Sequence, residues 1–111
     1  FHRGKYLDAE TVFQQFLADF GGTDLADNAQ FWIGEARYAR RDLPGAMAAF
    51  REVANRYPDG NKVPDALLKV ADCQRGLGDV EGARKSYQEV IERHPFAAAA
   101  AVAEDRMKQS P

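Results

Sequence analysis

The sequence predicts an all-α fold, an α-solenoid of antiparallel helix pairs closed by a capping helix at its C-terminal end. Three observations predict it: an internal repeat of 37 residues, apolar residues spaced as on one helix face, and connections too short to separate consecutive helices. Of the 111 residues, 45% are hydrophobic and 29% charged, and the net charge is −2. This composition is typical of one globular domain and excludes a disordered chain.

The repeat becomes visible when the chain is shifted by 37 residues, because Ala9, Ala46 and Ala83 then coincide. Large apolar residues coincide with them in the sets Tyr6/Leu43/Val80, Phe13/Phe50/Tyr87, Phe16/Val53/Val90 and Leu17/Ala54/Ile91. Steps of three and four residues place these positions on one face of a helix, whereas a strand has a period of two. We therefore expect helices over residues 5–20, 43–57 and 80–94.

A second set of helices is expected between the first, over residues 25–40, 63–76 and 97–108. Ala29, Trp32, Ile33 and Ala36 share one face, so we expect Trp32 to lie in the core. The whole chain, residues 1–111, is then a single domain. Its repeat copies span residues 1–23 (truncated), 24–60 and 61–96, and a capping helix follows over residues 97–108.

Residues that start and stop helices support these boundaries. Asp42 and Asp79 stand where an N-cap oxygen is needed, and Pro44 falls in a first helical turn. The opening residues 1–6 have the pattern of a helix end followed by a turn into the next helix. We therefore expect the chain to be a piece of a longer protein.

The segment from Phe31 to Tyr38, followed by Ala46, Phe50 and Pro58, resembles the tetratricopeptide repeat family. In that family small residues let the two helices of a pair approach each other, and Gly34 takes that place here. The resemblance implies a helical-repeat domain that binds proteins. The usual repeat of this family has 34 residues, so the copies in this chain are longer.

The longer repeat, with the phrases Arg56-Tyr57-Pro58-Asp59 and Val63-Pro64-Asp65-Ala66, is similar to the C-terminal domain of the YbgF/CpoB family of Tol–Pal system proteins. This resemblance implies a periplasmic protein linked to cell division and envelope constriction. It also implies a TolA-like helix as the partner and a homo-oligomer formed through an N-terminal segment. The sequence departs from that family at Gly21-Gly22 and at Arg37. Two alternatives stay open: the scaffold of a BamD-like outer-membrane assembly lipoprotein, and a generic peptide-binding module.

Stacked helix pairs form a concave face lined mainly by the first helix of each pair. We expect eight residues to point into this concavity and to bind a partner: Asn28, Phe31, Glu35, Tyr38, Asp65, Leu68, Asp72 and Arg75. Aromatic side chains on such a face supply affinity, and its carboxylates would select basic partners.

No residue pattern indicates an enzyme, a cofactor or a metal site. His2 and His94 are far apart in the chain, and Cys73 aligns with Ala36 as a small packing residue. A near-neutral net charge excludes nucleic acid as the expected partner, and no apolar run is long enough to insert into a membrane. No small-molecule substrate is expected. A clamp for C-terminal carboxylates is also disfavoured, because acidic residues occupy the places that it needs for lysine and asparagine.

Overall fold

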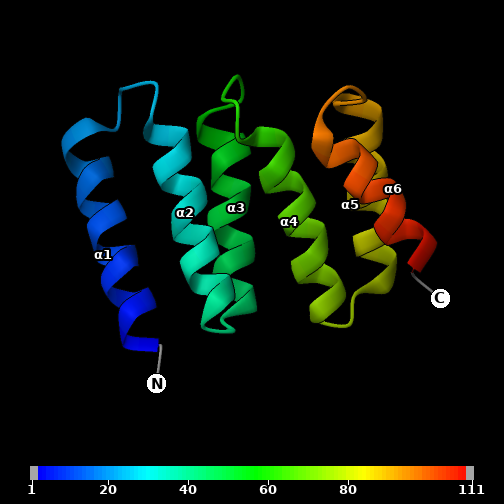
Figure 1. Cartoon of the computed structure of the whole chain (residues 1–111), viewed down its shortest axis with the longest axis horizontal. Helices are drawn as coiled ribbons and strands as arrows, with labels where there is room; N and C mark the ends of the chain where they lie inside the picture. The colour runs from blue at the N-terminus through cyan, green and yellow to red at the C-terminus, as the bar shows by residue number, and fades with distance from the viewer. Residues whose placement is uncertain (1–2, 110–111) are drawn as a thin grey trace.

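The computed structural model describes residues 3–109, which form the six α-helices that the repeat predicts. They are α1 (Arg3–Phe20), α2 (Ala26–Ala39), α3 (Leu43–Arg56), α4 (Val63–Gly76), α5 (Val80–Arg93) and α6 (Ala98–Gln109). The helices stand side by side and alternate in direction, with α1 at one end of the row (Figure 1). The all-α fold of antiparallel pairs is thereby confirmed.

The turns from α2 to α3 and from α4 to α5 use the same local chemistry. Asp42 accepts a hydrogen bond from the Gly45 N–H at 3.0 Å, and Asp79 accepts one from the Gly82 N–H at 2.9 Å. Each aspartate therefore satisfies a free donor in the first turn of the helix that follows it. The residue before each aspartate has a positive φ, which is 69° at Arg41 and 89° at Gly78.

The connection from α3 to α4 is fixed by a side chain of the preceding pair. The Oδ2 atom of Asp27, a buried residue of α2, accepts a hydrogen bond from the Lys62 N–H at 3.1 Å. A Cβ atom at Gly60 would lie 2.4 Å from the same carboxylate oxygen, so a side chain there would displace the Asp27 carboxylate. Asp27 therefore supplies the cap that Lys62, at the start of α4, does not supply itself.

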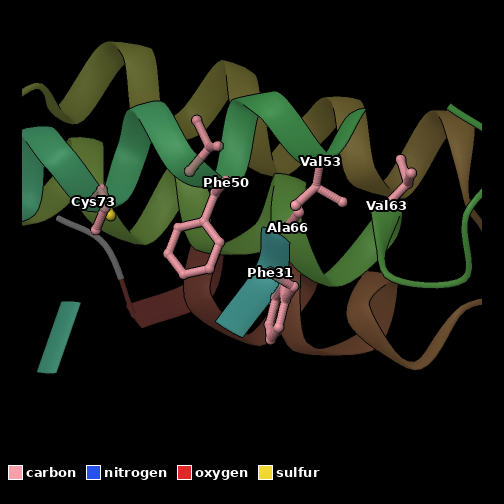
Figure 2. Packing of buried hydrophobic residues seen from close by; sticks show 8 residues of the cluster. Phe31, Phe50, Val53, Val63, Ala66 and Cys73 are labelled. Carbon is pink, nitrogen blue, oxygen red and sulfur yellow. The ribbon is translucent and has the colours of Figure 1, made fainter. Parts of the chain in front are cut away.

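Two apolar clusters hold the helices together. In the first, Phe50 and Val53 of α3 pack against Phe31 of α2 and Val63 and Ala66 of α4 (Figure 2). The second is built around Tyr87 and Val90 of α5, which the alanine-rich face of α6 covers. Helix α6 thus caps the last apolar face, as expected. Burying one large apolar side chain stabilises a fold by about 1.5–3 kcal/mol.

Two local expectations are wrong. Trp32 does not lie in the core, because 42% of it is exposed, and Ile33 and Ala29 take the buried positions of α2. Residues Arg3 to Lys5 do not form a turn; they belong to the first turn of α1. In that conformation the carbonyl groups of this segment bond to N–H groups of the next turn, as in any helix. The part of that expectation that concerns Phe1 and His2 lies outside the described residues.

Candidate functional site

The contacts between helices show which side of the molecule is concave. Among the described residues, α2 contacts α4 and α4 contacts α6, whereas α1, α3 and α5 do not contact one another. The stack therefore curves towards the side formed by α2, α4 and α6, which we call the inner face. These three are the first helices of their pairs, and α1, α3 and α5 are the second helices.

All eight predicted binding residues lie on α2 and α4, and none of them is exposed. Five are half-buried: Asn28, Glu35, Tyr38, Asp65 and Arg75. The other three, Phe31, Leu68 and Asp72, are buried. They are packed by the adjacent helices, as the two apolar clusters show for Phe31 and Leu68. That these eight residues bind a partner stays a prediction.

Two ion pairs join successive first helices across the inner face. Lys69 Nζ of α4 lies 3.3 Å from Glu35 Oε1 of α2, and Arg106 Nε of α6 lies 3.2 Å from Asp72 Oδ1 of α4. Each pair spans 34 residues of sequence, so the same geometry occurs twice. Two of the carboxylates expected to select a basic partner, Glu35 and Asp72, are therefore paired with cations of the same chain.

The second of these pairs belongs to a buried hydrogen-bond network. The Tyr87 hydroxyl of α5 donates to Asp72 Oδ1, the atom that also accepts from Arg106. Burial, together with this hydrogen bond, raises the pKa of Tyr87 above its usual range. The hydrogen bond and the charge of Asp72 likewise raise the pKa of Arg106. Tyr87 therefore stays neutral and Arg106 stays charged. Such groups stabilise the structure and do not transfer protons.

Cations and aromatic rings meet at the inner face. Lys62 Nζ lies 5.1 Å from the ring centroid of Phe31 and 5.6 Å from that of Trp32. Lys69 Nζ lies 4.6 Å from the ring centroid of Tyr38. Such contacts stabilise by about 0.5–1 kcal/mol at exposed sites. Trp32 is thus the large exposed aromatic of this face, with a positive charge beside it.

The sequence carries a signal for the position of Trp32. In the 37-residue alignment Trp32 coincides with Lys69, and a further shift reaches Arg106. A position filled by lysine and arginine in two copies is a surface position, because long charged side chains are almost never fully buried. The repeat alignment therefore identifies Trp32 as an inner-face residue.

A cleft of about 660 Å³ lies where the α1–α2 and α3–α4 connections meet, at the ends of the helices. Its walls include Asn28 and Tyr57. Asn28 Oδ1 and the Tyr57 hydroxyl are both buried, and neither has a hydrogen-bond partner among residues 3–109. The cleft has both polar and apolar walls, and Asn28 in its wall belongs to α2 of the inner face. The residues of the cleft come from two connections that lie 37 residues apart in the sequence. Helical spacing does not predict contacts between connections, so the cleft is not predicted from the sequence.

At the α1–α2 contact, Arg37 of α2 and Arg40, which follows the end of α2, both bind Glu10 of α1; Arg37 does so at 3.0 Å. Burial alone would raise the pKa of Glu10, but the hydrogen bonds and charges of the two arginines outweigh it and lower that pKa. Arg37 also donates to the Gly45 carbonyl at 3.2 Å. Arg37, at which the sequence departs from the YbgF/CpoB pattern, therefore has a defined structural role: it joins α1 and α2.

Cys73 is a free cysteine in the described part of the chain, and it is buried. Burial, with the nearby Asp72 charge, raises the pKa of the Cys73 thiol to about 11, so the thiol stays protonated and unreactive. Residues 3–109 contain no cluster of three or more histidine, cysteine or acidic side chains that could hold a metal ion. Over the same residues, no helix is long and apolar enough to cross a bilayer.

The family follows from comparison with known sequences. The profile described as Tetratricopeptide repeat matches residues 2–61, and a second profile with the same description matches residues 65–97. The chain belongs to the tetratricopeptide repeat family. Tetratricopeptide repeat domains are generally protein–protein interaction modules and typically non-catalytic scaffolds. No curated protein matches the chain.

Proposed function

We propose that this tetratricopeptide repeat domain is a non-catalytic adaptor that binds a helical segment of a partner protein on its inner face. The observation that carries the proposal is Trp32, a large aromatic residue left 42% exposed on a face that also carries two internal ion pairs. Tryptophan is among the residues that contribute most to binding at protein interfaces. A partner helix would place an apolar side chain against this ring.

The charges of the inner face define the partner further. Because Glu35 and Asp72 already bind Lys69 and Arg106, they do not select a basic ligand. Lys62 lies over aromatic rings, Arg75 lies 5.8 Å from the ring centroid of Tyr87, and neither cation forms an ion pair with a carboxylate among residues 3–109. We therefore expect an amphipathic helix whose apolar stripe is flanked by acidic residues.

The proposal extends to a role in the bacterial cell envelope, with a periplasmic location and a TolA-like helix as the partner. Its support is the similarity to the YbgF/CpoB family in the segment from Arg56 to Asp59, which lines the cleft. A link to cell division belongs to the same proposal. Oligomerisation through an N-terminal segment would raise the apparent affinity without any new contact.

Calorimetry with a TolA-type helical peptide tests the binding site. The unchanged domain should bind with a Kd on the order of micromolar. Trp32→Ala should weaken binding about tenfold, because the ring is the exposed anchor and its loss costs about 1.4 kcal/mol or more. Circular dichroism checks that this exposed substitution leaves the fold intact.

The matched control is Phe96→Ala, since Phe96 is a fully exposed aromatic residue in the α5–α6 connection. This variant should bind as the unchanged domain does. Equal affinities for both variants and the unchanged domain would remove Trp32 from the binding site. If an acidic amphipathic helix binds through Trp32 while the TolA-type peptide does not bind, the adaptor stands and the Tol partner is wrong.

A further inference from the structure

The cleft at the α1–α2 and α3–α4 connections is a concavity that the proposed function does not use. Both connections lie at the same edge of the row of helices (Figure 1), and residues from both line the cleft. Its volume of about 660 Å³ falls within the range of about 300–1,000 Å³ that ligand sites have in proteins. The cleft is therefore large enough for a side chain together with a short stretch of its main chain.

Negative charge predominates in the walls of the cleft. Asp24 of the first connection and Asp59 of the second are exposed, whereas Asp27 of α2 is buried. None of these three aspartates forms an ion pair among residues 3–109. Arg56 is the cationic residue of the walls, and its guanidinium carbon lies 5.6 Å from the ring centroid of Tyr57. Three carboxylates against one guanidinium favour a positively charged ligand.

Asp27 strengthens this preference because its carboxylate lies inside the protein, where it is only 3% exposed. Its Oδ1 atom accepts a hydrogen bond from the Asn28 N–H at 2.9 Å, and Oδ2 accepts one from the Lys62 N–H at 3.1 Å. Backbone N–H groups stabilise a carboxylate but carry no full positive charge. Water and salt screen a buried charge only weakly, so a cation in the cleft would be attracted by it.

Two residues of the walls have hydrogen-bonding capacity that the described residues leave unused. Asn28 Oδ1 and the Tyr57 hydroxyl are buried, and no group within residues 3–109 bonds to either of them. Both oxygens can accept a hydrogen bond, as can the carboxylates of Asp24 and Asp59. A ligand with several donors would therefore supply what this set of acceptors lacks.

These observations select a guanidinium group from the available cations. Residues 3–109 contain no cluster of side chains that could hold a metal ion. An ammonium group has three donors, whereas a guanidinium has five in a planar fork and forms paired hydrogen bonds with carboxylates. The walls also include Leu25 and Pro58, which offer apolar surface to a peptide chain.

We propose that the cleft binds the arginine side chain of an extended segment in a partner protein. The guanidinium would pair with Asp24 and Asp59, and the main chain of the segment would lie along Leu25 and Pro58. This site is separate from the inner-face anchor, and the inference does not depend on the proposed function. The two sites are nevertheless adjacent, because Asn28 lies one helical turn before Trp32 on α2. A partner that binds both would combine an acidic helix with an arginine outside that helix.

A titration followed by ¹H–¹⁵N NMR tests the site with acetyl-arginine-methylamide, a minimal arginine residue without terminal charges. We expect a Kd on the order of millimolar and shifts confined to the amides of residues 23–28 and 56–61. Acetyl-citrulline-methylamide has nearly the same shape without the charge and should bind at least tenfold more weakly. Equal binding of the two probes, or no shifts at these amides, would overturn the proposal.

Charge variants give the matched test. Asp24→Asn and Asp59→Asn should each weaken binding of acetyl-arginine-methylamide about threefold, and both positions are exposed, so the fold should be retained. The control is Asp105→Asn, since Asp105 is an exposed acidic residue of α6 away from the cleft, and it should leave Kd unchanged. A Kd that changes equally in all three variants would show that only net charge attracts the probe and would overturn the proposal.

Arg56→Gln tests the sign of the charge preference. It should strengthen binding about threefold, because it removes a cation that repels the ligand from the same cleft. Weaker binding in this variant would contradict a cation site. Free L-arginine should bind more weakly than acetyl-arginine-methylamide, since the aspartates repel its carboxylate. Tighter binding of free L-arginine would overturn the assignment to a protein segment.

Discussion

The two complete helix pairs, α2–α3 and α4–α5, share one register but are secured by different interactions. In the first pair Gly34 faces Phe50, and a Cβ atom at Gly34 would lie 2.5 Å from the Phe50 ring. In the second pair Ala71 and Tyr87 occupy these positions. The first pair also carries an additional aromatic contact, in which the Phe31 and Phe50 ring centroids lie 5.3 Å apart.

The ion pairs on the inner face differ in the same way. The Glu35 and Lys69 side chains are 29% and 27% exposed, whereas Asp72 is 6% exposed and also accepts the Tyr87 hydroxyl. Surface ion pairs contribute little to stability, but removing one partner of a buried network is costly. The comparison teaches that close aromatic packing secures the first pair and a buried polar network secures the second.

The largest difference should appear when each carboxylate is removed. Asp72→Ala should lower the free energy of unfolding by about 2–4 kcal/mol, because it leaves the buried Tyr87 hydroxyl without its acceptor and Arg106 without its partner. Glu35→Ala should cost less than about 1 kcal/mol, since its pair is partly solvated. Urea unfolding of both variants measures the two costs, and equal values would contradict the comparison.

A smaller difference should follow from exchanging the small residues between the helices of a pair. Gly34→Ala should destabilise by about 1–3 kcal/mol, because the fully buried Phe50 ring has no room to move. Its matched control, Ala71→Gly, should cost about 1 kcal/mol through lost helix propensity. Thermal unfolding compares the two variants. A stabilising Gly34→Ala would show that Phe50 shifts freely and that packing there is loose.

The smallest effect concerns the Tyr87 hydroxyl and depends on pH. Tyr87→Phe should cost about 1 kcal/mol at pH 7, since one buried hydrogen bond is lost. The pKa of Tyr87 is raised in the folded state, so the unfolded chain ionises first. The stability contributed by the protonated hydroxyl is full below the unfolded pKa of about 10 and is lost as pH rises above it.

Unfolding by urea between pH 8 and 11 measures this alkaline loss, which should be smaller in Tyr87→Phe. Tyr57→Phe is the control, because the buried Tyr57 hydroxyl has no hydrogen-bond partner. Its removal should change the free energy of unfolding by less than about 0.5 kcal/mol. An identical alkaline profile in Tyr87→Phe and the unchanged domain would place the hydroxyl outside the network.

The sequence predicts the helices well because their signals are local. Apolar spacing fixes the helical faces, and Asp42 and Asp79 fix two starts to the residue. The capping role of α6 also follows, because an alanine-rich segment can pack closely against α5 while its other side stays polar. The exception is the start of α1, where the repeat register and the observed helix differ at Gly4.

The candidate site is harder to predict because its contacts join residues of different copies. Helical spacing places Phe31 and Trp32 on neighbouring stripes of α2, and a small rotation of the helix decides which of the two is buried. The pairing of Glu35 with Lys69 depends on how closely α2 and α4 approach, which spacing along one helix does not give. The hydrogen bond from Lys62 to Asp27 has the same origin.

The ion pair between Asp72 and Arg106 limits how the domain can be shortened. In many repeat proteins each unit interacts only with its neighbours, so terminal units can be deleted with a roughly constant loss of stability. A chain that ended after Arg93 would instead leave the buried carboxylate of Asp72 without Arg106. It would also expose the apolar side of α5 that α6 covers. Engineers who trim or multiply the copies therefore need to keep a base 34 residues after each buried acid such as Asp72, and to finish on a helix that supplies the last base.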